Sequence, residues 1–302
     1  MTNITTEERK KWIGGSEIAS LFGESPYATK FELWHRKAGN LPEPDLDNER
    51  VEAGNFFEPA IAAWAEKKFG LQTRRVLRYM PHPTVKGYGT SLDYETVTGH
   101  YPVEIKNVDG LVFRDNWATE GDQIIDAPMH IILQLQAQMA CAKKDRGYLV
   151  ACVGGNRLYT AEIQAHAGTQ ARMEKAVAAF WQSIDAGDEP DPNFLKDAEA
   201  IAELYRMAGE AELDLTGNNR LTHLCHEYQA AAEDAKEAEN RKKAAKAEMI
   251  TIIGDAKKVV LGGFKISAAT TKDQEVQAHT KKGYRNFRLY PVAQAESEKE
   301  AA

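Results

Sequence analysis

The sequence has no apolar run close to the roughly 20 residues that a membrane-spanning helix needs. Its first residues, MTNITTEERKKW, are polar and charged and do not have the pattern of a secretory signal. These absences predict a protein that stays out of membranes and works in the cytoplasm. With 302 residues, the chain is long enough for one large domain and a smaller additional part.

Cysteine is scarce, and positive charge is not in excess. The three cysteines, Cys141, Cys152 and Cys225, lack metal-site spacing, so we expect buried thiols. The formal net charge of −7 argues against a simple nucleic-acid coat protein, because neutralising phosphates needs a positive face. Basic residues nevertheless outnumber acidic ones by seven to three over 50–86 and by twelve to four over 241–288. Such runs either bind a polyanion or only solvate helices, and the sequence leaves both open.

The first part of the chain predicts a mixed α/β core. Capping patterns and glycine stops indicate a short helix beginning at Ser16, a helix over 29–39 and an amphipathic helix over 50–69. The apolar period then shortens toward two, which predicts strands over 73–80, 88–95 and 101–108. A glutamine-rich helix, two further strands and a last helix complete this core, which we end at residue 196.

The second part of the chain has a different pattern. Positions 221, 224, 228, 231, 235, 238, 242, 245, 249 and 252 step by three and four, and all except Lys242 are apolar. This spacing predicts a helix whose apolar seam packs against the helix expected over 197–213. We therefore expect residues 197–302 to form a helical-hairpin arm, followed by a small β-hairpin near 259–270 and a basic segment.

Two acidic residues and a lysine lie on the strands expected over 88–95 and 101–108. Because side chains alternate along a strand, Glu104 and Lys106 point to one face. If the two strands form a hairpin, Asp93 and Glu104 meet, and such a pair of carboxylates favours Mg²⁺ or Mn²⁺. The carbonyl of Ile105 is a further candidate ligand. Lys106 would position and help to deprotonate a water near the metal, which is the apparatus of phosphodiester hydrolysis.

This pattern also has a plain structural interpretation. A strand with a solvated face of glutamate and lysine gives the same spacing, so the motif needs support from its surroundings. Glu58 offers such support, because it lies on the preceding helix beside Phe56 and Phe57. It is a candidate for the third carboxylate of the metal site, with a surface position as the alternative.

In its motifs, the chain resembles phage and prophage alkaline exonucleases of lambda-exonuclease or YqaJ type, within the PD-(D/E)XK nuclease superfamily. The motifs follow the family order through most of the first 200 residues: IGGSEIASLFGESPYATKFELWHRKAG, GNFFEP, SLDYE, VEIKN and LQLQAQMA. The resemblance implies a restriction-endonuclease-like core with a central mixed sheet flanked by helices. Leu92 departs from the pattern, since the superfamily consensus has proline there.

The resemblance also implies roles for individual residues around two divalent ions. Asp93 and Glu104 match the metal-binding acids, Lys106 matches the motif lysine, and Glu58 matches the helix glutamate that completes the site.

A second set of residues is implied to bind phosphate or DNA. Gln134 or Gln136 matches a glutamine near the catalytic pocket, with a buried or surface glutamine as the alternative for each. Arg9 and Ser16 match a pair that receives the terminal 5′-phosphate, with a plain helix cap as the alternative for Ser16. Arg114 is a further phosphate candidate.

The expected function is metal-dependent exonucleolytic hydrolysis of double-stranded DNA from an end, 5′ to 3′, in phage-type homologous recombination. The resemblance implies ring-forming homo-oligomers and hand-over of the remaining strand to a phage single-strand annealing protein. Four basic residues near the C-terminus are candidates for binding DNA or that partner: Lys281, Lys282, Arg285 and Arg288. The alternatives are a structure-specific or restriction-type endonuclease with the same site, and a non-catalytic DNA-end-binding scaffold.

Overall fold

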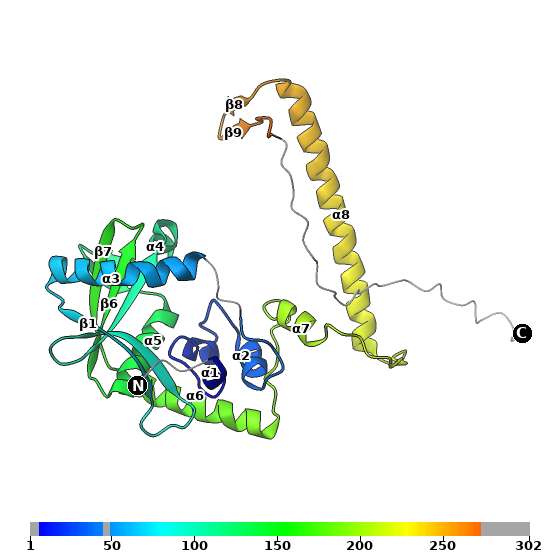
Figure 1. Cartoon of the computed structure of the whole chain (residues 1–302). Helices are drawn as coiled ribbons and strands as arrows, with labels where there is room; N and C mark the ends of the chain where they lie inside the picture. Colours follow the sequence, from blue (N-terminus) through cyan, green and yellow to red (C-terminus); the bar gives the residue numbers. More distant parts are fainter. Residues whose placement is uncertain (1–5, 45–48, 273–302) are drawn as a thin grey trace, which may run out of the picture. The chain divides into compact units, whose positions relative to one another are not determined.

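A seven-stranded mixed sheet organises the first part of the chain in the computed structural model, which describes residues 6–44 and 49–272 (Figure 1). The strand order is β1-β2-β3-β6-β7-β5-β4. The strands are β1 (Thr73–Pro81), β2 (Gly89–Thr96), β3 (Pro102–Val108), β4 (Ala118–Glu120), β5 (Gln123–Asp126), β6 (Arg146–Val153) and β7 (Arg157–Gln164). The first three strands form an antiparallel meander, whereas β3 and β6 are parallel neighbours.

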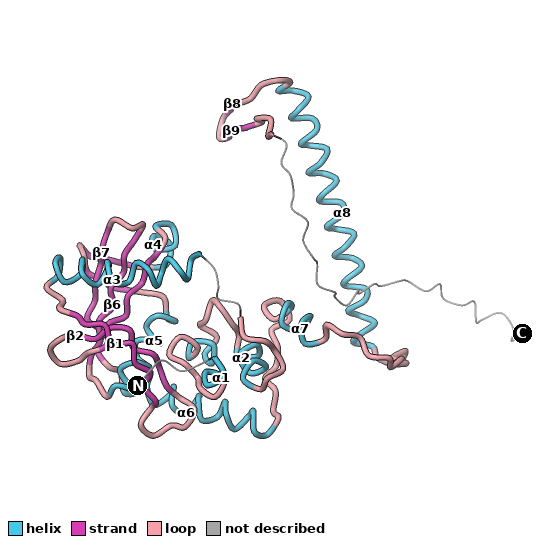
Figure 2. The backbone as a smooth tube through the Cα atoms, in the orientation of Figure 1, coloured by secondary structure: helices cyan, strands magenta, loops and turns pink. Residues whose placement is uncertain are grey.

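Helices pack on both sides of this sheet (Figure 2). The helices of this part of the chain are α1 (Thr6–Arg9), the 3₁₀ helix η1 (Ile18–Phe22), α2 (Lys30–Lys37), α3 (Glu49–Phe69), α4 (Gly110–Asn116), α5 (Met129–Ala142), α6 (Ala167–Ala186) and α7 (Ala198–Leu204). The prediction of a mixed α/β core, with a central mixed sheet flanked by helices, is confirmed. No described helix is both long and apolar enough to cross a membrane.

The central strand β6 accounts for the two layers of helices. Leu149 and Ala151 pack in the cluster that contains α5, whereas Val150 and Cys152 pack in the cluster that contains α3. Successive side chains of a strand point to opposite faces, so the apolar run of β6 needs cover on both sides. Its neighbour β3 is therefore held in the middle of the sheet, between α3 and α5.

The helix predicted to begin at Ser16 is different in the structure. A 3₁₀ helix, η1, takes its place, and Glu17, not Ser16, occupies the position before it. The Glu17 carboxylate accepts a hydrogen bond from the backbone N–H of Gly14 at 2.8 Å and forms an ion pair with Lys37 at 2.7 Å. The prediction of an N-cap at Ser16 is wrong, because residues 15–17 form a turn that the Glu17 side chain closes.

The chain divides into two compact units, Met1–Leu204 and Tyr205–Ala302, whereas the sequence placed the boundary at residue 196. Asp197 explains why the residues after it stay with the core. It is 1% exposed, accepts a hydrogen bond from the Thr29 hydroxyl, and accepts another from the backbone N–H of Asn193 at 2.7 Å. The start of α7 is thus anchored to α2 of the core.

The second unit contains one long helix, α8 (Asn219–Ile253), and a hairpin of β8 (Lys258–Leu261) and β9 (Phe264–Ser267). The β-hairpin was predicted, but the helical hairpin is wrong. α7 has only seven residues, and the described residues 205–218 form turns and irregular chain, including a turn closed by the Asp214 side chain. The basic segment with Lys281, Lys282, Arg285 and Arg288 lies outside the described residues.

The cysteines follow the division between the units. Cys141 and Cys152 are buried in the core, and burial raises the pKa of Cys141 to about 12. Cys225, on α8, is partly exposed, so the expectation of a buried thiol is wrong there. The reason is that no residue of α8 is buried.

Gly87 provides a test of how the core is held together. Its carbonyl accepts hydrogen bonds from the Trp181 indole at 2.9 Å and from the Ile13 N–H at 2.8 Å, and its φ is +72°. An added Cβ would lie 2.5 Å from Trp181 Nε1. We expect Gly87→Ala to lower the free energy of unfolding by roughly 2–4 kcal/mol, measured by urea denaturation.

Gly23→Ala is the matched control, because Gly23 has a φ of +73° with no atom within 4 Å of an added Cβ. Gly23→Ala should lower the free energy of unfolding by only about 1 kcal/mol, the cost of the left-handed backbone conformation for alanine. Equal losses for the two variants would mean that the contact with Trp181 does not constrain the core.

Candidate active site

Asp93 and Glu104 lie where two central strands separate. The antiparallel ladder of β2 and β3 has its last pair at Tyr94 and Val103. The same register, continued by one residue, sets Asp93 opposite Glu104. β3 remains paired with β6 beyond this point, so the two acids border an opening between β2 and β3.

Glu104 is the most enclosed of these groups, with 7% of its surface exposed. Its Oε1 lies 2.6 Å from Lys106 Nζ, and its Oε2 accepts a hydrogen bond from Gln138 Nε2 at 2.6 Å. Burial alone would lower the pKa of Lys106, but the charge of Glu104 and the hydrogen bond to it raise that pKa overall. Lys106 is therefore a cation in this arrangement, in direct contact with the Glu104 carboxylate.

The glutamine-rich helix α5 brings two of its glutamines to this site. Gln134 Oε1 accepts a hydrogen bond from Lys106 at 3.1 Å, and Gln138 is four residues further on the same helical face. Gln136 faces elsewhere, because it donates to the Gln164 carbonyl at 2.8 Å and accepts from the His166 N–H at 2.9 Å. Gln136 is thus a structural residue, and Gln138 was missed although its spacing from Gln134 could have indicated it.

Glu58 adds a third carboxylate from α3. Burial, followed by the negative charges of Asp93 and Glu104, raises the pKa of Glu58 to about 7, against the opposing effect of Arg75 and Lys106. Burial and then Glu104 also raise the pKa of Asp93. The three acids are therefore close enough to oppose one another's ionisation, as expected for carboxylates that share a site.

The donor chemistry fits a divalent cation, which would relieve the repulsion among three carboxylates. Among the described residues, however, no three Asp, Glu, His or Cys side chains are placed to hold a metal ion as they stand. Glu104 contributes to this, since both of its oxygens already contact other side chains. The role of the Ile105 carbonyl as a ligand stays a prediction.

Arg75, on the edge strand β1, is a site residue that the sequence analysis missed. It pairs with Tyr94 in the ladder, and its charge lowers the pKa values of both Glu58 and Asp93. Its side chain is exposed. The available signal was its place within the basic segment over 50–86, which does not distinguish it from six other basic residues there.

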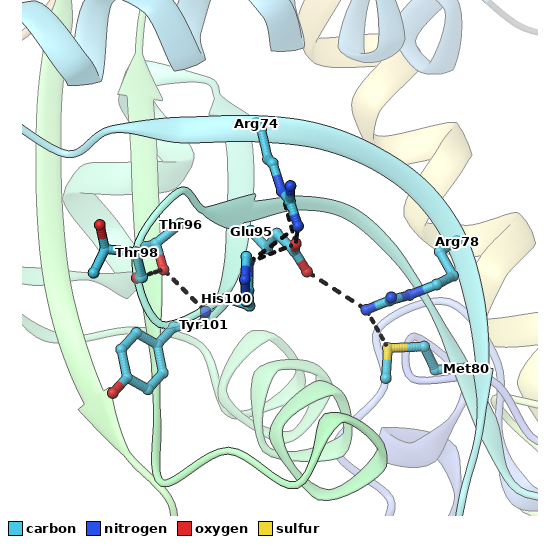
Figure 3. Close-up of polar contacts among 8 residues, drawn as sticks. All are labelled: Arg74, Arg78, Met80, Glu95, Thr96, Thr98, His100 and Tyr101. Carbon is cyan, nitrogen blue, oxygen red and sulfur yellow. Dashed lines mark hydrogen bonds and ion pairs between the residues drawn. The ribbon is translucent and has the colours of Figure 1, made fainter.

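The two neighbouring arginines of β1 have a different role, shown in Figure 3. Arg74 Nε donates to Glu95 Oε1 at 2.9 Å, and Arg78 Nη2 lies 3.5 Å from Glu95 Oε2. His100 Nδ1 lies 3.0 Å from the same carboxylate, which is 2% exposed. Glu95 thus lies beside two arginines, whereas Asp93, two residues earlier on β2, forms no ion pair with another described residue.

Residues of this site line two cavities. One, of about 850 Å³, is lined by Glu58 and Lys106 together with residues of α3, including Arg50. The other, of about 370 Å³, is lined by Asp93 and Gln134. Glu58, Lys106, Asp93 and Gln134 therefore each line one of these two cavities, whereas Glu104 lines neither.

The predicted phosphate-binding residues do not all lie at the candidate site. Arg9 and Ser16 line the smaller cavity together with Asp93, as does Arg36. Arg114 does not line either cavity; it lies on α4, is exposed, and pairs with the adjacent Asp115 at 2.8 Å. The structure thus brings Arg9 and Ser16 to the acids and leaves Arg114 apart from the two hollows.

Comparison with known proteins identifies related sequences. Residues 6–145 match the profile of the YqaJ-like viral recombinase domain. The uncharacterized protein YqaJ of Bacillus subtilis (strain 168) is 26% identical over 221 residues, which cover 70% of this chain and 66% of YqaJ. The resemblance to YqaJ-like proteins is confirmed.

Several solved structures are similar to part of the chain. The alkaline exonuclease LHK-Exo from Laribacter hongkongensis gives a TM-score of 0.48 at 21% identity, over 65% of this chain and 96% of LHK-Exo. LHK-Exo in complex with dAMP gives 0.47 at 21% identity, over 65% and 99%. A phage related exonuclease from Haemophilus somnus 129PT gives 0.45 at 12% identity, over 58% and 94%. The roles of individual residues rest on the geometry above and not on these structures.

The electrostatic coupling of Glu58 to Asp93 and Glu104 can be tested without measuring activity. Unfolded Glu58 ionises near pH 4.5, and the folded protein shifts this pKa to about 7, so ionised Glu58 destabilises the fold fully above pH 7 and not below pH 4.5. Glu58→Gln should therefore stabilise the metal-free protein at about pH 8, by up to about 2 kcal/mol after allowance for solvent, and less at about pH 5.5.

The measurement is thermal denaturation in EDTA at both pH values. Glu66→Gln is the control, because Glu66 is an exposed glutamate on the same helix. It should leave the stability unchanged at both pH values. A stabilisation by Glu58→Gln that is equal at both pH values would contradict the coupling.

Proposed function

With residues 6–145 matching the YqaJ-like viral recombinase domain, we propose that the protein is a metal-dependent exonuclease of double-stranded DNA. It hydrolyses phosphodiester bonds from a DNA end, 5′ to 3′, in phage-type homologous recombination in the bacterial cytoplasm. The observation that carries this proposal is the group of Asp93, Glu104 and Lys106 at the opening between β2 and β3, with Glu58 facing them.

Asp93, Glu104 and Glu58 would hold Mg²⁺ or Mn²⁺ through their carboxylate oxygens, with the Ile105 carbonyl as a further donor and two ions as the expected number. A bound divalent ion supplies an acidic water and neutralises charge on the phosphate. The mutual repulsion of the three acids supports this assignment, because a group of anions is stable at neutral pH only with a cation or a shared proton.

The other residues of the site orient these ligands. Gln138 donates to one oxygen of Glu104 and fixes the rotation of its carboxylate. Lys106, held between Glu104 and Gln134, carries a positive charge to the place where the scissile phosphate would lie. As a cation it binds and orients an oxygen of the phosphate or of the attacking water, and stabilises negative charge that develops during cleavage.

The cationic residues around the two cavities would bind the DNA backbone. Arg9 is the main candidate for the terminal 5′-phosphate, beside Ser16, in the smaller cavity. Arg75 would bind a phosphate near the acids from the side of β1. Because the whole chain is acidic, such local cations must supply the attraction for DNA.

The recombination role also includes two assembly proposals. The strand that survives digestion is handed to a phage single-strand annealing protein, and copies of the enzyme form a homo-oligomer with a ring as the expected form. The family's description as a viral recombinase domain supports the first of these.

Digestion of labelled DNA tests the function. Linear duplex DNA carrying a 5′ or a 3′ label is offered beside a covalently closed circle, with Mg²⁺ or EDTA. We expect metal-dependent loss of the 5′ label first, an intact circle, and at least a hundredfold lower rate for Lys106→Ala. Lys86→Ala, an exposed lysine away from both cavities, is the control and should digest DNA like the unaltered protein.

Each other outcome identifies a different function. Cutting of the closed circle would replace the proposal with an endonuclease. DNA binding without any metal-dependent cleavage would replace it with an end-binding scaffold.

A pair of glutamine variants tests the positioning role of α5. Gln138→Met removes the donor to Glu104 and should lower kcat by about 10- to 100-fold, with a raised requirement for metal. Gln136→Met removes the bonds to Gln164 and His166 and should lower stability by about 1–3 kcal/mol with little change in kcat per folded molecule. The same kcat loss in both variants would show that Gln138 has no specific role.

A further inference from the structure

The long helix α8 has an apolar face that the described chain does not bury. It has 35 residues and none is buried. Leu221, Leu224 and Met249 are 42%, 41% and 45% exposed, and Ile252 is 76% exposed. A helix of this length in water depends on packing of its apolar face, so these side chains call for a partner.

The apolar positions of α8 follow a strict repeat, which we call the α8 seam. The seam steps by three and four through five heptads and consists of Leu221, Leu224, Tyr228, Ala231, Ala235, Ala238, Lys242, Ala245, Met249 and Ile252. A repeat of 3.5 residues keeps one face of a helix toward a second helix along a left-handed supercoil. A repeat sustained over three or four heptads is enough to indicate a coiled coil. The seam therefore fits another long helix, and not a sheet or a small ligand.

Within the described residues, the second unit contains no other helix that could fill this role. The preceding helix α7 has seven residues, which is too short to cover a seam of five heptads. The long helix α6 uses its own apolar residues, Met173, Val177 and Phe180, in the core of the first unit. The partner of matching length and pattern is another α8.

We propose that α8 pairs with α8 of a second copy of this chain in an antiparallel two-stranded coiled coil. Lys242 decides the orientation. In a parallel in-register pair, Lys242 faces Lys242 of the second copy within the apolar seam, where like charges repel. In the antiparallel pair with full overlap, Lys242 faces Ala231, whose small side chain leaves the ammonium free to reach solvent.

The antiparallel register also matches side-chain size along the seam. Leu221 faces Ile252, and Leu224 faces Met249, so large apolar residues meet at both ends. Ala235 faces Ala238 in the middle, where small side chains let the two helix axes approach closely. Every seam position then has a partner, and the two halves of the pair are equivalent by two-fold symmetry.

Charges beside the seam favour the same orientation. In the antiparallel pair, Asp234 lies beside Arg241 of the second copy, and this attraction occurs twice. In the parallel pair, Asp234 would instead lie beside Glu239, and Arg241 beside Lys246, so all these pairs repel.

One kind of pair opposes the antiparallel arrangement, since Glu227 lies beside Glu248, and this repulsion also occurs twice. Both residues flank the seam, where solvent screens their charges, whereas the parallel repulsions include Lys242 facing its own copy within the apolar seam. The balance of charge thus favours antiparallel pairing.

Sedimentation velocity of the full chain tests the pairing. We expect the unaltered protein to have twice the mass of Ala235→Glu, which sets a charge in the middle of the seam of each copy and should weaken pairing at least a hundredfold. Ala247→Glu is the matched control, because Ala247 is an exposed alanine on the opposite side of α8 and should leave the mass unchanged. Equal masses for the unaltered protein and Ala235→Glu would overturn the proposal.

Cross-linking tests the orientation. Leu224→Cys and Met249→Cys are each made with Cys225→Ser, and the two proteins are oxidised separately and after mixing. The antiparallel pair predicts a covalent dimer only in the mixture, since each new cysteine faces the other position. Covalent dimers of either variant alone would indicate a parallel pair, and no cross-link in any sample would indicate that another segment covers the seam; both would overturn the proposal.

Discussion

The buried carboxylate of Glu104 is the constraint on which the arrangement of this site depends. A carboxylate with only 7% exposure is costly to bury unless its oxygens find donors, and they do so in Lys106 on the same strand and Gln138 on α5. This requirement ties the central strand to a particular face of α5. The same helix is held against the sheet by Leu135 and Met139, so apolar packing and polar positioning reinforce each other.

The acidic residues of β2 have different electrostatic surroundings. On β2, Glu95 pairs with the cations Arg74 and Arg78, whereas Asp93 faces two other acids and has a raised pKa. Glu58 is affected most, since its pKa is raised to about 7. One strand thus presents one satisfied acid that stabilises the meander and one unsatisfied acid that suits a cation. Three acids thus lie together where a nuclease would hold metal, and arginines on β1 and near the N-terminus border them.

The second unit follows a different physical logic from the core. Its long helix buries nothing of its own, and its pattern of charges and alanines discriminates between parallel and antiparallel neighbours. An enzyme joined to a second copy through such helices would present two catalytic cores from one assembly. The basic residues Arg241, Lys243 and Lys246 of α8 would then lie along the helix pair, where they add a surface for an acidic polymer without changing the core.

The sequence by itself determined the features that depend on local periodicity: the strand alternation that puts Glu104 and Lys106 on one face, the register that brings Asp93 opposite them, and the hairpin after α8. Tertiary structure decided the rest. Whether Gln134, Gln136 or Gln138 faces the acids depends on the rotation of α5, which distant apolar contacts set. The place of Arg75, the turn at Glu17 and the exposure of α8 depend likewise on which segments meet. Periodicity fixes which side of an element is apolar, but only packing between elements fixes what that side meets.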